Sequence, residues 1–289
     1  MSLDIDGVVV GHATDAAART GCTVLVFPDG AAAGVHVPGS ATGTRELGVL
    51  APGHLARKVH AIVLSGGSAF GLATADGVMG ALAERGVGHR VGEHVVPIVV
   101  AAILFDLAVA TRRPGPDDGR AAVEAAYDDA PFAMGAVGAG TGATVGMASG
   151  TPGHGGLGWA QRVVGRYQLA AVVACNAVGS VRDADGAWLA GGPPTLGGAG
   201  EEGAHTTLVA VVTDAALTRE QCVVVAKMAA AGLARALEPA FLPFDGDVVF
   251  CAATGRAEGA VAPEGLAALG TVAAELVVRA VREGVRAAQ

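Results

Sequence analysis

The chain has 289 residues, of which 52% are hydrophobic, 16% charged and 4% aromatic. This composition provides enough apolar surface for a sizeable core and excludes a disordered chain. The formal net charge of −8, without any run of Lys or Arg, argues against binding to nucleic acid or to an anionic membrane surface.

Localisation and assembly follow from the same composition. No apolar run reaches the roughly 18 residues of a membrane span, and the N-terminus lacks the basic and apolar parts of a secretory signal. We therefore expect a cytoplasmic protein. Because charged residues are too few to coat a monomer of this size, we also expect a homo-oligomer, a tetramer or larger.

The first half of the chain alternates strand and helix patterns. The segment 22–27 (CTVLVF) predicts a strand, 61–86 a strand, a glycine turn and a helix, and 120–130 a helix. Ser68 is the expected cap of the helix within 61–86. The apolar stretch 96–109 fits either type, and 132–150 is rich in glycine.

The second half contains the one candidate boundary. Residues 184–205 have the composition of a linker, with seven Gly, two Pro and no periodicity. The other expected elements are a buried strand in 167–181 that ends near Asn176, a strand at 207–214, a helix at 217–239 capped by Thr218, a strand in 245–255 and a helix from about 263 to 283. Strands on both sides of the linker are too apolar to stand alone, which predicts one core built from two chain segments.

Several motifs invite a functional interpretation that their details do not support. GAGTGATVG (138–146) lacks the Lys-Ser/Thr of a Walker loop, and no ribose-binding acid follows a dinucleotide motif. It fits a glycine-lined pocket wall or a close-packed turn. GGSAFG (66–71) departs from the G-x-S-x-G of serine hydrolases. The histidines lack metal-ligand spacing, and the four cysteines lie far apart in apolar runs, so we expect buried thiols, no metal and no cofactor.

The stretch AHTTLVAVV (204–212) raises a more specific possibility. A threonine hydroxyl is a poor nucleophile unless a base takes its proton, and an N-terminal threonine has such a base in its own α-amine. An internal threonine reaches that state only if the bond before it is cut. A loose segment that leads into a strand at Thr206 suits such a cut, although threonine also begins ordinary strands.

Together these residues give the chain a resemblance to the DmpA-like aminopeptidase family, which includes β-peptidyl aminopeptidases and nylon-oligomer hydrolases, with ornithine acetyltransferases more distant. The blocks that carry it follow in family order: VGHATDAAARTGCTVLVF (10–27), GTRE (43–46), VHAIVLSGGSAFGLATADGVM (59–79), VPIVVAAILFDL (96–107), GAVGAGTGATVG (135–146), AVVACNAVGSVRD (171–183), TTLVAVVTDAALT (206–218) and DGDVVF (245–250). The resemblance implies an α+β fold, a four-layer αββα sandwich of the DmpA/ornithine acetyltransferase type. It also implies one domain over 1–289, processed into a larger chain, 1–205, and a smaller one, 206–289.

The resemblance also implies roles for individual residues. Thr206 is the expected nucleophile, and His205–Thr206 the self-cleaved bond. Asn176 is the expected oxyanion donor, and Asp245 and Asp247 are the expected pair that positions the amine and hydroxyl of Thr206. Further support is expected from Thr207 and from the glycine-rich loop, including Gly140 and Gly142.

Four positions depart from the family pattern. At Met147 the family commonly has Lys, and at Phe105 some active members have Tyr. At His205 the family often has Asn or Gly. The segment PGSA (38–41) stands where the family usually has GGAP. Losing the lysine removes a charge and up to three hydrogen-bond donors.

From the resemblance as a whole, we expect a hydrolase of small aminoacyl amides, esters, peptides or ω-amino-acid oligomers. The alternatives are an unprocessed member with a binding or structural role, and an acyltransferase to an amine.

Overall fold

The computed structural model describes residues 3–128, 132–195 and 205–289 of the chain. Its largest sheet has nine strands in the order β10-β11-β14-β16-β2-β4-β7-β3, with β1 paired to β2. These strands are β1 (Val9–Asp15), β2 (Thr20–His36), β3 (Gly43–Arg45), β4 (Val59–Ser65), β7 (Val99–Ile103), β10 (Gly156–Val164), β11 (Tyr167–Asn176), β14 (Thr206–Thr213) and β16 (Val248–Ala253).

Strand β2 connects two halves of this sheet. Its first part pairs with β1 and β4, and its last part, from Ala32 to His36, pairs with β16. The register with β4 shifts between Val26 and Ala31, where the strand passes from one half to the other. The prediction of a strand at 22–27 was therefore correct but covered only the first part of a 17-residue strand.

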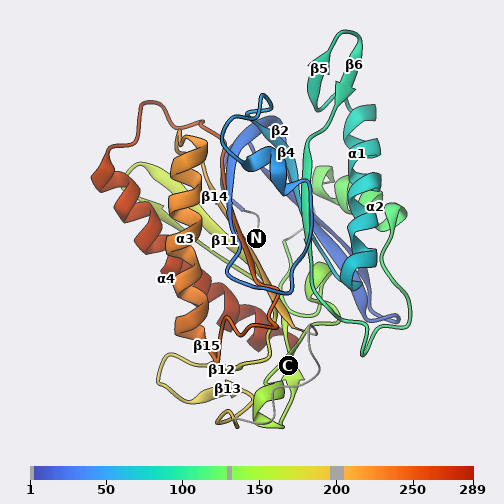
Figure 1. The fold of residues 1–289 in the computed structure, drawn as a ribbon, viewed down its shortest axis with the longest axis vertical. Helices are drawn as coiled ribbons and strands as arrows, with labels where there is room; N and C mark the ends of the chain where they lie inside the picture. The colour runs from blue at the N-terminus through green and yellow to red at the C-terminus, as the bar shows by residue number, and fades with distance from the viewer. Residues whose placement is uncertain (1–2, 129–131, 196–204) are drawn as a thin grey trace.

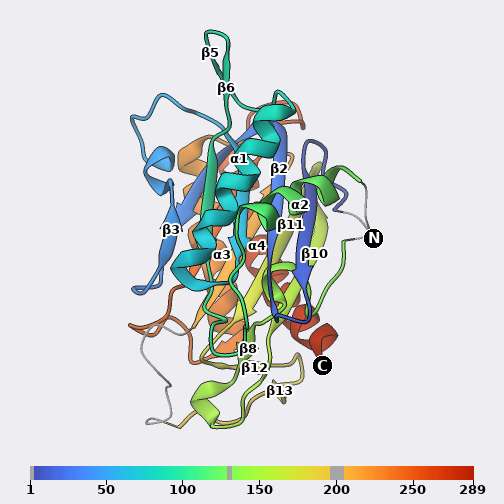
Figure 2. The same cartoon turned by 90° about the vertical axis from the view of Figure 1, so that its right-hand side faces the viewer.

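The two halves face each other, and paired helices cover their outer faces (Figure 1). Helices α3 (Arg219–Ala236) and α4 (Pro263–Ala288) lie on one side, and α1 (Thr74–Glu84) and α2 (Pro116–Tyr127) on the other. Figure 2 shows α1 and α2 lying across the strands, with the small hairpin of β5 (His89–Val91) and β6 (His94–Val96) projecting beyond them.

Three separate hydrophobic cores fill the spaces between the layers. One lies between β10, β11, β14 and β16 and the helices α3 and α4, one between the two half-sheets, and one under α1 and α2. Three cores between successive layers define four layers, so the αββα sandwich is confirmed. Strand β14 pairs with β11 on one side and β16 on the other, so strands from both sides of the predicted linker lie in the same sheet.

Glycine allows the closest contact between a helix and a sheet. A Cβ on Gly158 of β10 would overlap the backbone of α4 at Ala280 and Gly284. The same is true of Gly284 against Leu157 and Gly158. Backbones that touch without side chains between them explain part of the high glycine content.

Two local predictions were wrong. Ser68 does not cap a helix: it is the first residue of a 3-10 turn (Ser68–Ala73), and α1 begins only at Thr74. The linker contains structure, because Trp188–Ala190 form β13, which pairs with β12 (Ser180–Arg182). Residues 196–204 of that predicted linker lie outside the described residues.

The expected helix at 217–239 is α3, and Thr218 caps it by accepting a hydrogen bond from Gln221 N at 3.2 Å. The C-terminal helix continues to Ala288, beyond the expected end. The ambiguous stretch 96–109 contains β7 followed by a loop. None of the helices in the described part of the chain has the length and apolarity that crossing a membrane requires.

Candidate active site

Thr206 and Asn176 lie directly opposite each other on neighbouring antiparallel strands. Thr206 begins β14, Asn176 ends β11, and the two are register partners. Even-numbered residues of both strands belong to the core between the half-sheets, and odd-numbered ones to the core under α3 and α4. The two side chains therefore share the inner face, where Cβ atoms of such a pair are about 5 Å apart.

Two backbone groups fix the amide of Asn176. Its Oδ1 accepts from Thr144 N at 2.9 Å, and its Nδ2 donates to Phe105 O at 3.1 Å. Since an N–H cannot be an acceptor nor a carbonyl a donor, this pair sets which end of the amide is oxygen. One Nδ2–H remains for another acceptor, as an oxyanion donor requires.

The Thr206 hydroxyl lies against the bond that the sequence predicts to be cut. Its Oγ1 donates to the carbonyl oxygen of His205 at 2.7 Å, and the same oxygen accepts from Gly246 N at 2.9 Å. Thr206 is only 3% exposed. A Cβ on Gly246 would overlap Thr206 Oγ1, so position 246 must be glycine if the hydroxyl is to keep this place.

The loop that carries Gly246 is held by the PGSA segment. Ser40 N and Ala41 N donate to Asp245 O at 2.8 and 3.0 Å, and Gly39 N donates to Asp247 O at 3.2 Å. The segment that differs from the family's GGAP thus still provides backbone donors to the 245–247 loop. Sequence reasoning missed this contact because backbone groups have no residue signature.

Burial changes the ionisation of both aspartates. It raises the pKa of Asp245 to about 6, against the opposing effect of Leu242 N–H, which donates to Oδ2 at 2.7 Å. Burial, and then the charge of Asp245, raise the pKa of Asp247 to about 7. Oδ1 of Asp245 is buried and has no hydrogen-bond partner among the described residues, so it is free to accept a proton or an ammonium N–H.

Asp247 contacts Thr207, the neighbour of the nucleophile. Its Oδ1 accepts from Thr207 N at 2.7 Å, and its charge is one cause of the raised pKa of Cys175, the register partner of Thr207. Through this hydrogen bond, Asp247 stabilises the start of β14 on the face that packs against α3 and α4. The hydroxyl of Thr207 is buried beside the Cys175 thiol, whose pKa it lowers against the larger opposing effect of burial, and the backbone N–H of Thr207 is the group that binds Asp247.

His205 is buried as a neutral imidazole. It is 4% exposed, and burial lowers its pKa to about 4. Its backbone is extended and bridges to Asp245 in parallel, so its side chain points to the face opposite that of Thr206. The imidazole is therefore not placed to take the proton of the Thr206 hydroxyl.

The glycine-rich loop supports the site through Thr144, while its glycines are used for packing. The N–H of Gly140 donates to Val137 O at 2.8 Å, and a Cβ on Gly140 or Gly142 would overlap the backbone at Leu157 or Arg19. Of the two expectations for this loop, a pocket wall or a close-packed turn, these contacts favour the close-packed turn at Gly140 and Gly142. Half-buried Met147 begins the next 3-10 turn, and Phe105 contributes its carbonyl to Asn176.

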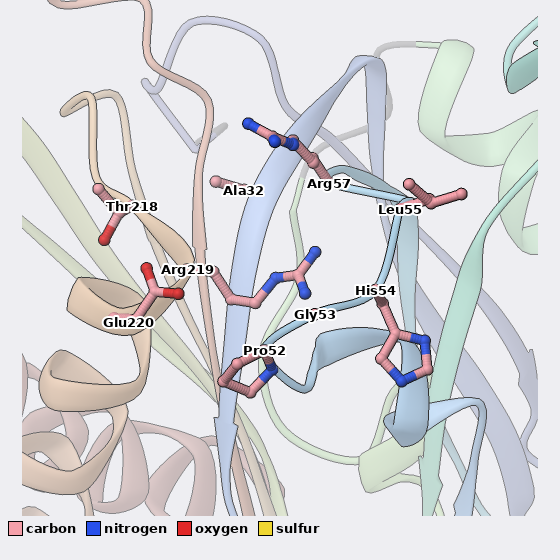
Figure 3. Close-up of a pocket in the computed structure, with 9 residues that line it drawn as sticks. All are labelled: Ala32, Pro52, Gly53, His54, Leu55, Arg57, Thr218, Arg219 and Glu220. Carbon is pink, nitrogen blue, oxygen red and sulfur yellow. The ribbon is translucent and has the colours of Figure 1, made fainter.

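A surface pocket of about 560 Å³ lies away from this site. It is lined by Ala32, residues 52–55, Arg57 and the start of α3 at 218–220. Figure 3 shows Arg219 reaching from α3 toward the 52–57 segment, where it donates to Ala51 O and to Ala56 O. Ala32 pairs with Ala253, which pairs with Thr213, the far end of β14, about 23 Å along the strand from Thr206.

All four cysteines are buried and free, as the sequence predicts. Across residues 3–128, 132–195 and 205–289, no three His, Cys, Asp or Glu side chains are grouped to hold a metal ion. The chemistry available at Thr206 is that of its hydroxyl, two aspartates, one amide donor and backbone N–H groups.

Solved structures of other proteins share this fold. The solved L-aminopeptidase D-Ala-esterase/amidase of Ochrobactrum anthropi, described as a variant of the Ntn-hydrolase fold, matches with a TM-score of 0.77 at 21% identity, over 100% of this chain and 86% of that one. This likeness establishes the fold.

Sequence comparison gives the family. The family model of peptidase family S58 matches residues 2–289. An uncharacterised aminopeptidase of Mycobacterium leprae is 37% identical over 99% of this chain and 90% of its own. A 6-aminohexanoate-oligomer endohydrolase of Paenarthrobacter ureafaciens is 30% identical over 98% and 85%. The chain belongs to peptidase family S58 and is a peptide or amide hydrolase, which confirms the family that its motifs resemble.

Proposed function

We propose that the chain cuts its own His205–Thr206 bond and that the freed Thr206 hydrolyses small amino-terminal amides through an acyl-enzyme. The observation that carries this proposal is the position of the Thr206 hydroxyl, 2.7 Å from the His205 carbonyl oxygen and opposite Asn176. One hydroxyl therefore lies between the bond to be cut and a fixed amide donor.

In turnover, the α-amine of the cut chain would take the proton of its own hydroxyl as that hydroxyl attacks the substrate carbonyl. The remaining N–H of Asn176 would stabilise the oxyanion. Asp245 and Asp247 would hold the new amine, and the unpartnered Oδ1 of Asp245 supports this role. Water would then hydrolyse the ester on Thr206 and release the acid product.

The relatives indicate the substrate class. Their names include an aminopeptidase and a 6-aminohexanoate-oligomer endohydrolase. We therefore propose aminoacyl amides, esters, short peptides and ω-amino-acid oligomers as substrates.

The proposed setting is a cytoplasmic homo-oligomer of four or more copies. Only 16% of residues are charged, and several large apolar side chains are exposed, led by Leu55 at 96%. Burial of such side chains between copies is the expected reason. Light scattering that returns the monomer mass of 28.2 kDa would refute the assembly.

A panel of aminoacyl p-nitroanilides, β-peptides and 6-aminohexanoate oligomers tests the activity. The wild-type chain should hydrolyse at least one class, and Thr206→Ala should hydrolyse none. Thr213→Ala, which changes a threonine at the other end of the same strand, is the matched control and should keep its activity. Activity that survives in Thr206→Ala would place the nucleophile elsewhere.

A further inference from the structure

The His205 carbonyl and the Asn176 amide lie on different sides of strand β14. β14 lies between β11 and β16. The His205 carbonyl points toward the β16 side, where Gly246 N donates to it at 2.9 Å. Asn176 belongs to β11, on the other side.

We infer that Thr206 uses two separate oxyanion donors: the backbone N–H of Gly246 during self-cleavage and the side chain of Asn176 during substrate hydrolysis. This inference rests on the proposed function, because it concerns the same nucleophile. It adds a catalytic role for Gly246 that is distinct from that of Asn176.

The Gly246 N–H already makes the bond that this role needs. A peptide carbonyl lies in the plane of its sheet and points to one neighbouring strand, so the His205 oxygen cannot turn to β11 without breaking the start of β14. The Asn176 amide is equally fixed, by Thr144 N and by Phe105 O. Unless the backbone rearranges, Asn176 therefore cannot donate to the His205 carbonyl oxygen. For the same reason, Gly246 N–H cannot donate to a carbonyl on the β11 side.

The cut then proceeds in balanced steps. Thr206 Oγ1 bonds to the His205 carbonyl carbon, its proton passes to water, and the carbonyl electrons move onto the oxygen that Gly246 N–H holds. When the carbonyl reforms, the bond from carbon to Thr206 N breaks and that nitrogen takes the proton back, which leaves an ester. Water cleaves the ester, giving the His205 carboxyl group and restoring the Thr206 hydroxyl.

Asn176 variants separate the two reactions. Full-length chains with Asn176→Ala or Asn176→Asp are made by pulsed cell-free translation, and cleavage is followed over time on denaturing gels. We expect self-cleavage within about threefold of wild type, while turnover per cleaved molecule falls by about 10²-fold, the usual effect of losing an oxyanion donor. The Asp variant keeps the acceptor for Thr144 N, which guards against a loss of local structure in the Ala variant.

Gly246→glycolic acid, incorporated during the same cell-free translation, removes the other donor because it replaces the N–H by an ester oxygen and adds no Cβ that would overlap Thr206 Oγ1. It should slow self-cleavage by about 10²-fold or more, with an unchanged circular dichroism spectrum. Ser40→Pro is the control, because it removes an N–H that binds the same loop at Asp245 O, where Ala41 N also donates. This control should cleave within about tenfold of wild type.

The outcomes distinguish this inference from the proposed function. If Asn176 variants slow self-cleavage as strongly as turnover, or if the chain with glycolic acid at position 246 cleaves at the wild-type rate, the two-donor inference is overturned while self-cleavage stands. If the wild-type chain does not cleave at all, the proposed function fails first.

Discussion

Replacing Asp247 by Asn should make the uncut protein more stable at alkaline pH. The carboxyl group is 4% exposed, and burial with the nearby charge of Asp245 raises its pKa from 3.8 to about 7. In the folded chain the group therefore holds its proton over a pH range in which the unfolded chain has released it. By linkage, stability falls as pH rises from about 4 to about 7 and stays low above that.

The size of the effect follows from the same pKa. A rise from 3.8 to about 7 corresponds to about 4 kcal/mol of stability lost above pH 7. Asn keeps the acceptor for Thr207 N–H, but its amide N–H group meets the Phe241 N–H that also donates to Asp247, at a cost of about 1–3 kcal/mol. The expected net gain at pH 8 is about 1–3 kcal/mol, or a rise in Tm of about 2–5 °C for a chain of this length.

The assay uses the Thr206→Ala background, because there the α-ammonium that would pair with Asp247 never forms. Tm is measured by calorimetry at pH 4 and pH 8 for Thr206→Ala with and without Asp247→Asn. The gain should be present at pH 8 and absent or reversed at pH 4. An equal effect at both pH values, or destabilisation at pH 8, would refute the reasoning that Asp247 is a buried, strained carboxylate.

Three further results are expected. Met147→Lys should speed self-cleavage on a time-course gel, since it supplies the cation that the resemblance predicts at this position, whereas an unchanged rate would mean that the cation is not limiting. Asp245→Asn should lower the turnover of the cleaved chain, because the unpartnered Oδ1 would no longer carry the charge proposed to hold the new amine, and an unchanged turnover would remove Asp245 from that role. Gly158→Ala should lower Tm by more than about 5 °C because its Cβ would overlap the backbone of α4, while Gly80→Ala, which meets only the end of the Arg120 side chain, should change it little.

Side-chain chemistry in the sequence located half of the site. Thr206 and Asn176 stand at the ends of apolar runs, so the sequence predicts them at strand ends, and the structure makes them register partners. The sequence does not predict the role of Gly246, because its contribution is a backbone N–H and the residue type does not determine the direction of that N–H. The same is true of Thr144.

Tertiary context also decided the elements that were missed. The strand expected at 22–27 is longer than its apolar run, because pairing with β16 carries β2 on to His36. β10 begins with glycines that pack against α4, so its sequence lacks the usual strand pattern. β13 forms inside a stretch of linker composition because β12 is available to pair with it.

The mass of the purified chain tests the central claim most directly. After incubation at pH 8, intact mass spectrometry of the wild type should show two species that correspond to residues 1–205 and 206–289, with Thr206 as the new N-terminus, and Thr206→Ala should show a single full-length species. A wild-type chain that keeps the full-length mass, or one that is cut equally in Thr206→Ala, would contradict the account.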